Sequence, residues 1–267
     1  MLVPVRVSIN TMIWPSDTCS KQEDRSQESG VRIRTGALAG LAVCLPMLAG
    51  SVGGKIELRD SKESVVSKKM DYSGVAVWLE TIAVGISTPA LPAHAVMAQK
   101  DKAFSPHLLT VRTGTVVDFP NFDPIFHNAF SKYDGKVFDV GLYPPGSSRS
   151  VTFTRPGAVR VFCNIHAAMS AVIVVLNTPY FTTTRKNGVF ELANVPPGEY
   201  WLRVFHERST QATLDGAARR IMIASEPMAV PSIPLSESGY LAIPHKNKFG
   251  HEYSGEPDDA AYPAVRK

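Results

Sequence analysis

Three side chains that can bind a transition metal, Cys163, His166 and Met169, follow one another at intervals of three residues. A thiolate, an imidazole and a thioether together suit copper that cycles between Cu(I) and Cu(II). In such sites the thiolate and two imidazoles bind in a trigonal plane, and the methionine sulfur makes a longer axial contact. The stretch therefore predicts one mononuclear copper site, provided that a second histidine lies nearby.

His127 is the best candidate for that second imidazole. It lies 36 residues before Cys163, in a polar loop after the strand-like run TVVDFP. Each residue alone has a plainer interpretation, because a free cysteine is among the most buried residue types and Met169 alone is more often a core residue. The complete set of donors favours copper ligation over those interpretations.

The spacing Cys-x2-His-x2-Met, with a histidine–asparagine pair upstream, resembles the cupredoxin family, and the short ligand loop is most similar to that of amicyanin. The resemblance covers about residues 96–177. It implies a Greek-key β-sandwich with a type 1, or blue, copper site. It also implies that His127, Cys163 and His166 are the equatorial ligands and that Met169 is the axial ligand.

The same resemblance assigns roles to residues around the ligands. The amide of Asn128 would tie the two ligand loops together and so fix the ligand geometry. The residues expected to shield or adjoin the site are Phe126, Phe130, Phe162 and Asn164. One position departs from the pattern, because Ala167 stands where many such loops have proline. Without that ring the loop loses a constraint on φ, which leaves its rigidity and the reduction potential open.

The elements that must position these residues read as short β-strands. Residues 96–177 contain alternating or β-branched runs bounded by Gly, Pro or Asn, namely LLTVRTG, TVVDFP, RSVTFT, AVRVFC and SAVIVVLN. The ligand stretch lies between the last two runs. The chain has 20 prolines and 19 glycines, which indicates many turns. We therefore predict an all-β protein.

A second resemblance lies on both sides of this segment. Residues 178–235 contain the motifs Gly-Val-Phe and Val-Pro-Pro-Gly and the alternating run Tyr-x-Leu-x-Val, which are similar to a carboxypeptidase regulatory-like, or transthyretin-like, β-sandwich. The opening strands of such a domain are found instead within residues 52–95. We expect one smaller sandwich that is split by insertion of the cupredoxin segment, since insertion at a loop tip is well tolerated. The rival layout packs the residues before the insertion on the cupredoxin sheet.

The first 51 residues read as a leader. Residues 31–51 have a basic start, a short apolar stretch and small residues, which is the pattern of a secretory signal peptide. The preceding residues fit no such pattern, so we hypothesise that Val31 is the true start. Export to the periplasm or beyond follows, with no transmembrane segment after signal removal. Cys19 and Cys44 lie in the leader, so Cys163 has no partner for a disulfide.

The remaining polar residues carry plainer predictions. Residues 236–267 are polar without a sustained period and are predicted to form a poorly ordered tail. His107 is expected at the surface near a strand start. Other histidines expected at the surface or in the core are His94, His206, His245 and His251. Aspartates expected in turns or at rims are Asp118, Asp123 and Asp139.

Several function classes are disfavoured. The net charge of the 267 residues is only +4, and no basic cluster interleaved with aromatics supports nucleic-acid binding. No nucleophile–base–orienter set and no His-x-His pattern of a multicopper oxidase occurs, so we expect a carrier rather than an enzyme. The leading prediction is an exported blue-copper protein that passes single electrons between redox partner proteins, with a hint of amine oxidation from the loop. The alternatives are a periplasmic copper carrier or sensor and a structural or adhesion module.

Overall fold

The computed structural model describes residues 49–82, 93–132, 135–241 and 244–253. Its regular elements are mostly strands with two short helices, so the predicted all-β class is confirmed. Within these ranges, no helix is both long and apolar enough to cross a membrane. Almost all of the predicted leader and the last part of the predicted tail lie outside the described residues.

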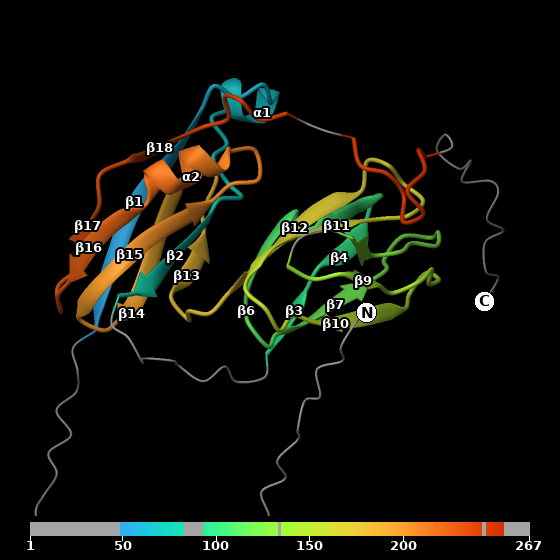
Figure 1. The fold of residues 1–267 in the computed structure, drawn as a ribbon, viewed down its shortest axis with the longest axis horizontal. Coiled ribbons are helices and arrows are strands. Elements are labelled where there is room, and N and C mark those ends of the chain that lie inside the picture. The colour runs from blue at the N-terminus through green and yellow to red at the C-terminus, as the bar shows by residue number, and fades with distance from the viewer. Residues whose placement is uncertain (1–48, 83–92, 133–134, 242–243, 254–267) are drawn as a thin grey trace, which may run out of the picture. The chain divides into compact units, whose positions relative to one another are not determined.

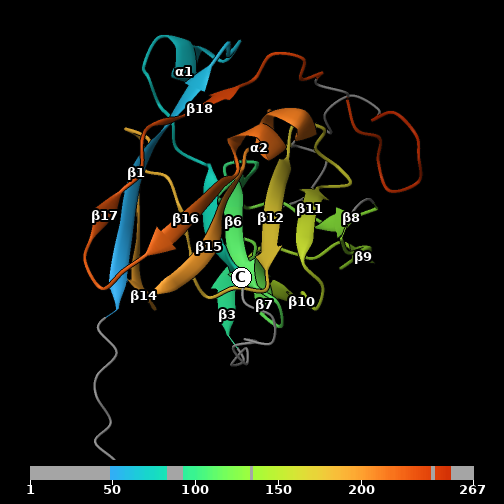
Figure 2. The ribbon, with the colours of Figure 1, turned by 60° about the vertical axis from the view of Figure 1, so that its left-hand side comes forward.

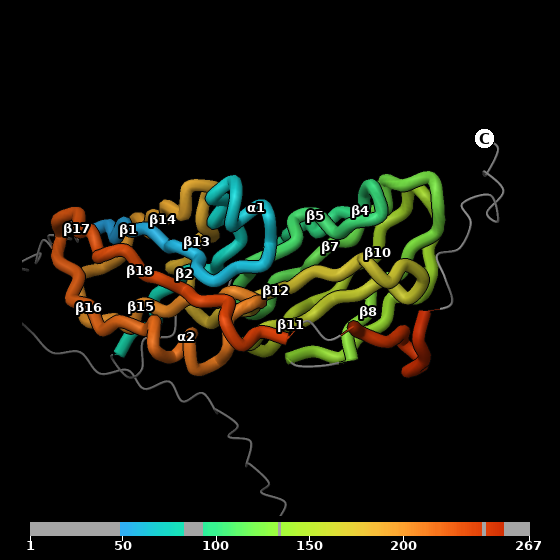
Figure 3. The backbone as a smooth tube through the Cα atoms, turned by 90° about the horizontal axis from the view of Figure 1, so that it is seen from above, coloured from blue at the N-terminus to red at the C-terminus, as the bar shows by residue number. Residues whose placement is uncertain are grey.

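Strands from both ends of the described chain share two sheets, which we call the flanking unit (Figure 1). The first sheet contains β14 (Val189–Val195), β1 (Gly50–Arg59), β17 (Met228–Ala229) and β18 (Ile233–Ser236). The second contains β13 (Phe181–Thr183), β2 (Ala76–Thr81), β15 (Gly198–Phe205) and β16 (Arg219–Ile223). Figure 3 shows β1 beside β14, its antiparallel partner. Because β2 pairs with β13 and β15, the strands on either side of the chain's middle segment belong to one pair of sheets.

The middle segment forms its own sheets, which we call the middle unit. A five-stranded sheet has the order β6 (Leu108–Arg112), β12 (Ser170–Leu176), β11 (Gly157–Phe162), β8 (Phe130–Ser131) and β9 (Phe138–Asp139). Figure 2 shows these five strands side by side in that order. A three-stranded sheet contains β10 (Ser148–Thr152), β7 (Val116–Pro120) and β3 (His94–Val96). The last two strands, β4 (Ala98–Lys100) and β5 (Ala103–Ser105), pair with each other.

Two helices complete the elements, and both belong to the flanking unit. They are α1 (Ser64–Ser67) and α2 (Gln211–Ala217). The side chain of Thr210 caps α2 by accepting a hydrogen bond from the backbone N–H of Thr213, which satisfies one of the free donors of the first turn. Helix α1 has no side-chain cap and contributes Val66 to the core of its unit.

Strand β12 is buried on both faces. Its odd-numbered residues Ala171, Ile173 and Val175 join the core of the middle unit. Its even-numbered residues join a second apolar cluster with residues of the flanking sheet: Val172, Val174 and Leu176 with Ala76, Trp78, Phe181 and Phe205. Burial on two faces explains why this strand reads as a continuous apolar run instead of alternating. The strand that follows the predicted ligand stretch therefore belongs to two cores.

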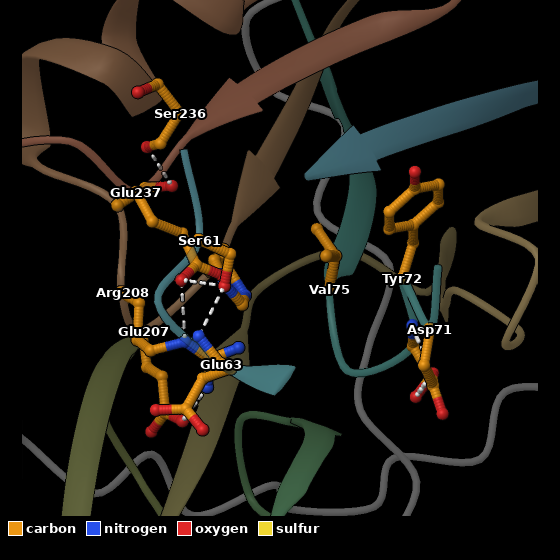
Figure 4. A network of polar contacts seen from close by, with 12 residues as sticks. Ser61, Glu63, Asp71, Tyr72, Val75, Glu207, Arg208, Ser236 and Glu237 are labelled. Carbon is orange, nitrogen blue, oxygen red and sulfur yellow. Dashed lines mark hydrogen bonds and ion pairs between the residues drawn. The ribbon is translucent and has the colours of Figure 1, made fainter. Parts of the chain in front are cut away.

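A buried ion-pair network lies in the flanking unit (Figure 4). Glu237 is at its centre, with its carboxylate 2.9 Å from Nε2 of His206 and 3.1 Å from Nε of Arg208. The hydroxyl of Ser61 donates to the same carboxylate at 2.7 Å. Burial alone would raise the pKa of Glu237, but these partners outweigh it and lower the pKa to about 2.

The turn before β14 depends on glycine. Gly188 has φ +77°, and a Cβ atom there would meet the backbone carbonyl of Ile56. Gly74 has a similar φ of +78° but open space around it. Left-handed backbone costs another residue about 1–2 kcal/mol. We expect Gly188→Ala to lower the free energy of unfolding well beyond that figure, and Gly74→Ala to cost only the backbone strain. Chemical denaturation of both variants tests this, and equal losses would contradict the close approach.

Candidate metal centre

The ligand stretch forms the loop of a β-hairpin. Strand β11 ends at Phe162, and this residue pairs with Ser170 at the start of β12. The backbone N–H of Cys163 donates to the carbonyl of Met169 at 3.1 Å, and that of Met169 donates to the carbonyl of His166 at 3.1 Å. The loop is thus folded back on itself, which brings its three sulfur and nitrogen donors to the same end of the hairpin.

His127 reaches the same place from the loop after β7. Its backbone forms an isolated bridge with Tyr143, with hydrogen bonds of 3.2 Å and 2.9 Å in the two directions. The hydroxyl of Tyr143 in turn donates to the carbonyl of Phe119 at 2.9 Å. Burial raises the pKa of Tyr143, so the hydroxyl remains a donor at neutral pH. The loop that carries His127 is therefore anchored on the three-stranded sheet.

The structure brings three of the predicted ligands together. Sγ of Cys163 lies 3.9 Å from Nδ1 of His127 and 3.7 Å from Nδ1 of His166. All three donor atoms lie within 4.8 Å of one another, and all three residues are buried. A sulfur and a nitrogen bound to one transition-metal ion at about 2.3 Å and 2.0 Å, with an angle near 120°, are about 3.7 Å apart. The donor set and its spacing fit a single copper ion.

Met169 and the aromatic residues predicted to shield the donors are buried or partly buried. Met169 is 1% exposed and packs in the same apolar cluster as Cys163. Phe130 and Phe162 are buried with their ring centroids 5.9 Å apart, whereas Phe126 is partly buried. An apolar, dry surrounding restricts the access of water to a bound metal and thereby influences its redox potential.

Asp123, which was predicted to lie in a turn or at a rim, is in fact buried against the predicted ligand His127. Oδ2 of Asp123 lies 2.7 Å from Nε2 of His127, and the residue is 6% exposed. Burial lowers the pKa of His127 in spite of this partner, which favours a neutral ring. A neutral ring that donates from Nε2 to the carboxylate leaves the lone pair of Nδ1 free for a metal.

Backbone donors hold that carboxylate in place. It accepts from the backbone N–H groups of Asp101 and Lys102. Burial acts to raise the pKa of Asp123, but these hydrogen bonds and His127 hold the pKa below its ordinary value. The sequence signal for this residue was its place four residues before His127 in a polar loop.

Asn128 has a different partner from the one expected. Its amide donates to Oδ1 of Asp139 at 2.7 Å and to the carbonyl of Gly141 at 2.9 Å, and not to the 163–169 loop. The amide therefore ties the His127 loop to the turn after β9. The expectation that Asn128 links the two ligand loops is corrected by these contacts, because Asp139 offers a charged acceptor close by.

Part of the predicted poorly ordered tail instead packs against the ligand loop. We call residues 244–253 the C-terminal strap (Figure 1, red). The hydroxyl of Tyr253 donates to the carbonyl of Cys163 at 2.7 Å, and the backbone N–H of Lys248 donates to Oδ1 of Asn164 at 2.9 Å. These partners are separated by more than 80 residues, and no short pattern in the sequence marks them.

The remaining predicted histidines are not part of the three-donor cluster. Among the described residues, the cluster of Cys163 and two histidines is the one group with metal-binding spacing. His107 lies 2.7 Å from the carboxylate of Glu207 in the flanking unit, with about half of its side chain exposed. His94 lies 2.9 Å from Asp118 and is exposed. Cys163 is free and buried.

Comparison with known proteins identifies one curated relative. The chain is 29% identical over 153 residues to chloroplastic plastocyanin of Oryza sativa subsp. indica, a match that covers 51% of this chain and 95% of the relative. No protein-family model matches the chain. Solved structures with similarity include a reduced amicyanin mutant (21% identity, 31% of this chain and 81% of that chain, TM-score 0.29) and a purple cupredoxin from Nitrosopumilus maritimus (23%, 31% and 99%, TM-score 0.28).

Proposed function

We propose that this chain, which is 29% identical over 153 residues to a plastocyanin, is a cupredoxin-like, exported type 1 copper protein that passes single electrons between redox partner proteins. The observation that carries the proposal is the buried cluster of one cysteine sulfur and two imidazole nitrogens within 4.8 Å. Copper bound there supplies the one-electron chemistry, by cycling between Cu(I) and Cu(II).

The residues of this chain would have distinct tasks in such a site. Cys163 provides the thiolate, and His127 and His166 provide the two imidazoles. Met169, buried in the same cluster, would be the fourth residue to hold the ion, through its thioether sulfur. Burial of all four residues keeps bulk water away from the donors. A site shielded from bulk water, with its ligands on two hydrogen-bonded loops, would need little rearrangement when its charge changes, which suits a carrier rather than an enzyme that transforms a substrate.

The visible spectrum of the copper-loaded protein tests the proposal. We expect the intense colour of a blue-copper site in the wild type and its loss in Cys163→Ser, because the colour arises from the copper–thiolate bond. His94→Gln, which replaces an exposed histidine outside the cluster, should keep the colour. A blue Cys163→Ser protein would sink the ligand assignment.

Other outcomes separate the alternative functions. Copper that binds without intense colour would favour a periplasmic copper carrier or sensor. A protein whose thermal stability does not rise with copper would favour a structural role, since a ligand that binds the native state stabilises it. The narrower proposal of amine oxidation depends on the length of the ligand loop alone. Rapid reduction of the copper protein by an amine-oxidising dehydrogenase, measured by stopped flow, would support it.

A further inference from the structure

The C-terminal strap contacts the ligand loop along most of its length. Tyr253 binds the carbonyl of Cys163 at the first residue of the loop. Nε2 of His245 lies 2.8 Å from the carbonyl of Ala167, near its other end. Between them, Lys248 binds the side chain of Asn164. Two loop carbonyls and one loop side chain are therefore held from outside the hairpin.

The side chains of the loop itself contribute few interactions that would fix its backbone. Ala167 and Ala168 are exposed and offer only methyl groups for packing. Two backbone–backbone hydrogen bonds lie inside the loop, and both involve Met169, at its end. Because position 167 is alanine, no proline ring fixes φ there. The ring of His245 donates its hydrogen bond to the carbonyl of that same residue, Ala167. The strap therefore restrains a residue whose φ is not fixed by a proline ring.

The strap has a defined structure of its own. A turn is closed by hydrogen bonds between the backbones of Asn247 and His251, at 2.9 Å, and of Gly250 and Asn247, at 2.9 Å. Oδ1 of Asn247 also accepts from the backbone N–H groups of Phe249 and His251. A ten-residue segment with this many internal bonds can transmit a restraint.

Two further contacts fix the strap on the middle unit. The ring of His245 stacks on Phe162, with centroids 4.0 Å apart and planes at 30°. Nζ of Lys248 lies 2.8 Å from Oδ2 of Asp139, the same carboxylate whose other oxygen accepts from Asn128. Nδ1 of His245 also lies 3.2 Å from the hydroxyl of Tyr253, which joins the two ends of the strap. The strap is thus attached directly to the 163–169 loop, and to the loop of His127 through Asp139 and Asn128.

We propose that the C-terminal strap is an external clamp that positions the ligand loop, with Tyr253 and His245 as its positioning residues. The loop sequence lacks a proline that would make the loop rigid. Hydrogen bonds from the clamp, a distant part of the chain, supply that rigidity instead. The proposal rests on the proposed function only where it concerns the geometry of bound copper. The restraint on Cys163 itself exists with or without metal.

Reactivity of the Cys163 thiol in the metal-free protein measures the restraint directly. Cys163 is 0% exposed, so a soluble aromatic disulfide reagent reaches it only when the loop opens. We expect Tyr253→Phe, which removes one hydrogen bond, to raise the rate of modification roughly 2- to 10-fold. A chain that ends at Leu241 loses all the strap contacts and should react more than about tenfold faster. Tyr240→Phe is the matched control and should react at the wild-type rate.

The copper-loaded proteins then show whether the clamp sets ligand geometry. We expect Tyr253→Phe to change the relative intensities of the copper–thiolate absorption bands and to speed the release of copper to a chelator, with Tyr240→Phe unchanged. Wild-type thiol reactivity in the chain ending at Leu241 would overturn the restraint. A blue Tyr253→Phe protein with the wild-type spectrum would overturn the positioning role. A wild type that takes up no copper would instead sink the proposed function, while the thiol rates would still decide the restraint.

Discussion

Replacing Asp123 by asparagine is expected to weaken copper binding by about 10- to 100-fold and to raise the reduction potential. The carboxylate lies 2.7 Å from Nε2 of His127 and accepts two backbone hydrogen bonds as well. An asparagine has one oxygen, so its amide NH₂ group must face one of these donors. In either orientation Nε2 of His127 loses its charged acceptor, which weakens the support for the tautomer that presents Nδ1 to the metal.

The direction of the change in potential follows from charge. A buried negative charge next to a ligand favours Cu(II) over Cu(I), because Cu(II) carries the larger positive charge. Removal of the charge should therefore weaken Cu(II) binding more than Cu(I) binding. Each tenfold difference between the two affinities raises the potential by about 59 mV.

Cyclic voltammetry and chelator competition on matched variants check this prediction. Asp118→Asn is the control, because Asp118 also faces a histidine, His94, but that ring is exposed and outside the cluster. Asp118→Asn should keep the wild-type potential and copper affinity. Equal potentials in wild type and Asp123→Asn would show that the carboxylate has no influence on the metal.

Glu237→Gln is expected to lower the free energy of unfolding at pH 7 by about 3 kcal/mol. The estimate follows from the pKa of Glu237, which is lowered from 4.5 to about 2 by His206, Arg208 and Ser61 against the opposing effect of burial. Glutamine keeps the shape of the side chain but removes its charge. The partly buried guanidinium of Arg208 then loses one carboxylate partner, and this loss is part of the same cost.

The pH dependence gives this prediction a second signature. A carboxyl group whose pKa is lowered on folding stabilises the fold above its unfolded pKa, here about 4.5, and the contribution disappears as the pH falls to about 2. The difference between wild type and Glu237→Gln should shrink over that window. Denaturant titrations at several pH values measure this difference. Glu57→Gln, which replaces a partly exposed ion-pair partner of Lys55, is expected to change the stability little. A difference that does not vary with pH would contradict the ionic origin.

The sequence predicted those features that short spacings encode. Alternating and β-branched runs predicted an all-β protein, and the spacing of Cys163 and His166 placed two donors on one loop between strands. Periodicity and spacing carry this information because strand faces and hairpin loops are local. The structure then brings His127 to these donors, as the resemblance implied.

Features that depend on contacts between residues far apart in the chain could not be predicted from the sequence. Asp123 was interpreted as a turn or rim residue, since a buried carboxylate is uncommon unless it is paired, and its partner shows only in three dimensions. Tyr253 and His245 belong to a polar stretch without a period, and their partners lie 90 and 78 residues earlier. The amide of Asn128 donates a hydrogen bond to Asp139, which lies on a short strand that no sequence pattern predicted.

Strand β12 has a consequence for how this chain can change over evolutionary time. Its seven residues begin where the ligand loop ends, and alternate residues serve two different cores. A substitution that enlarges or shrinks a side chain on one face is compensated inside the middle unit, whereas one on the other face also changes the packing against Ala76, Trp78, Phe181 and Phe205 of the flanking sheet. The two units therefore cannot diverge independently, and their sequences are expected to change in a correlated way.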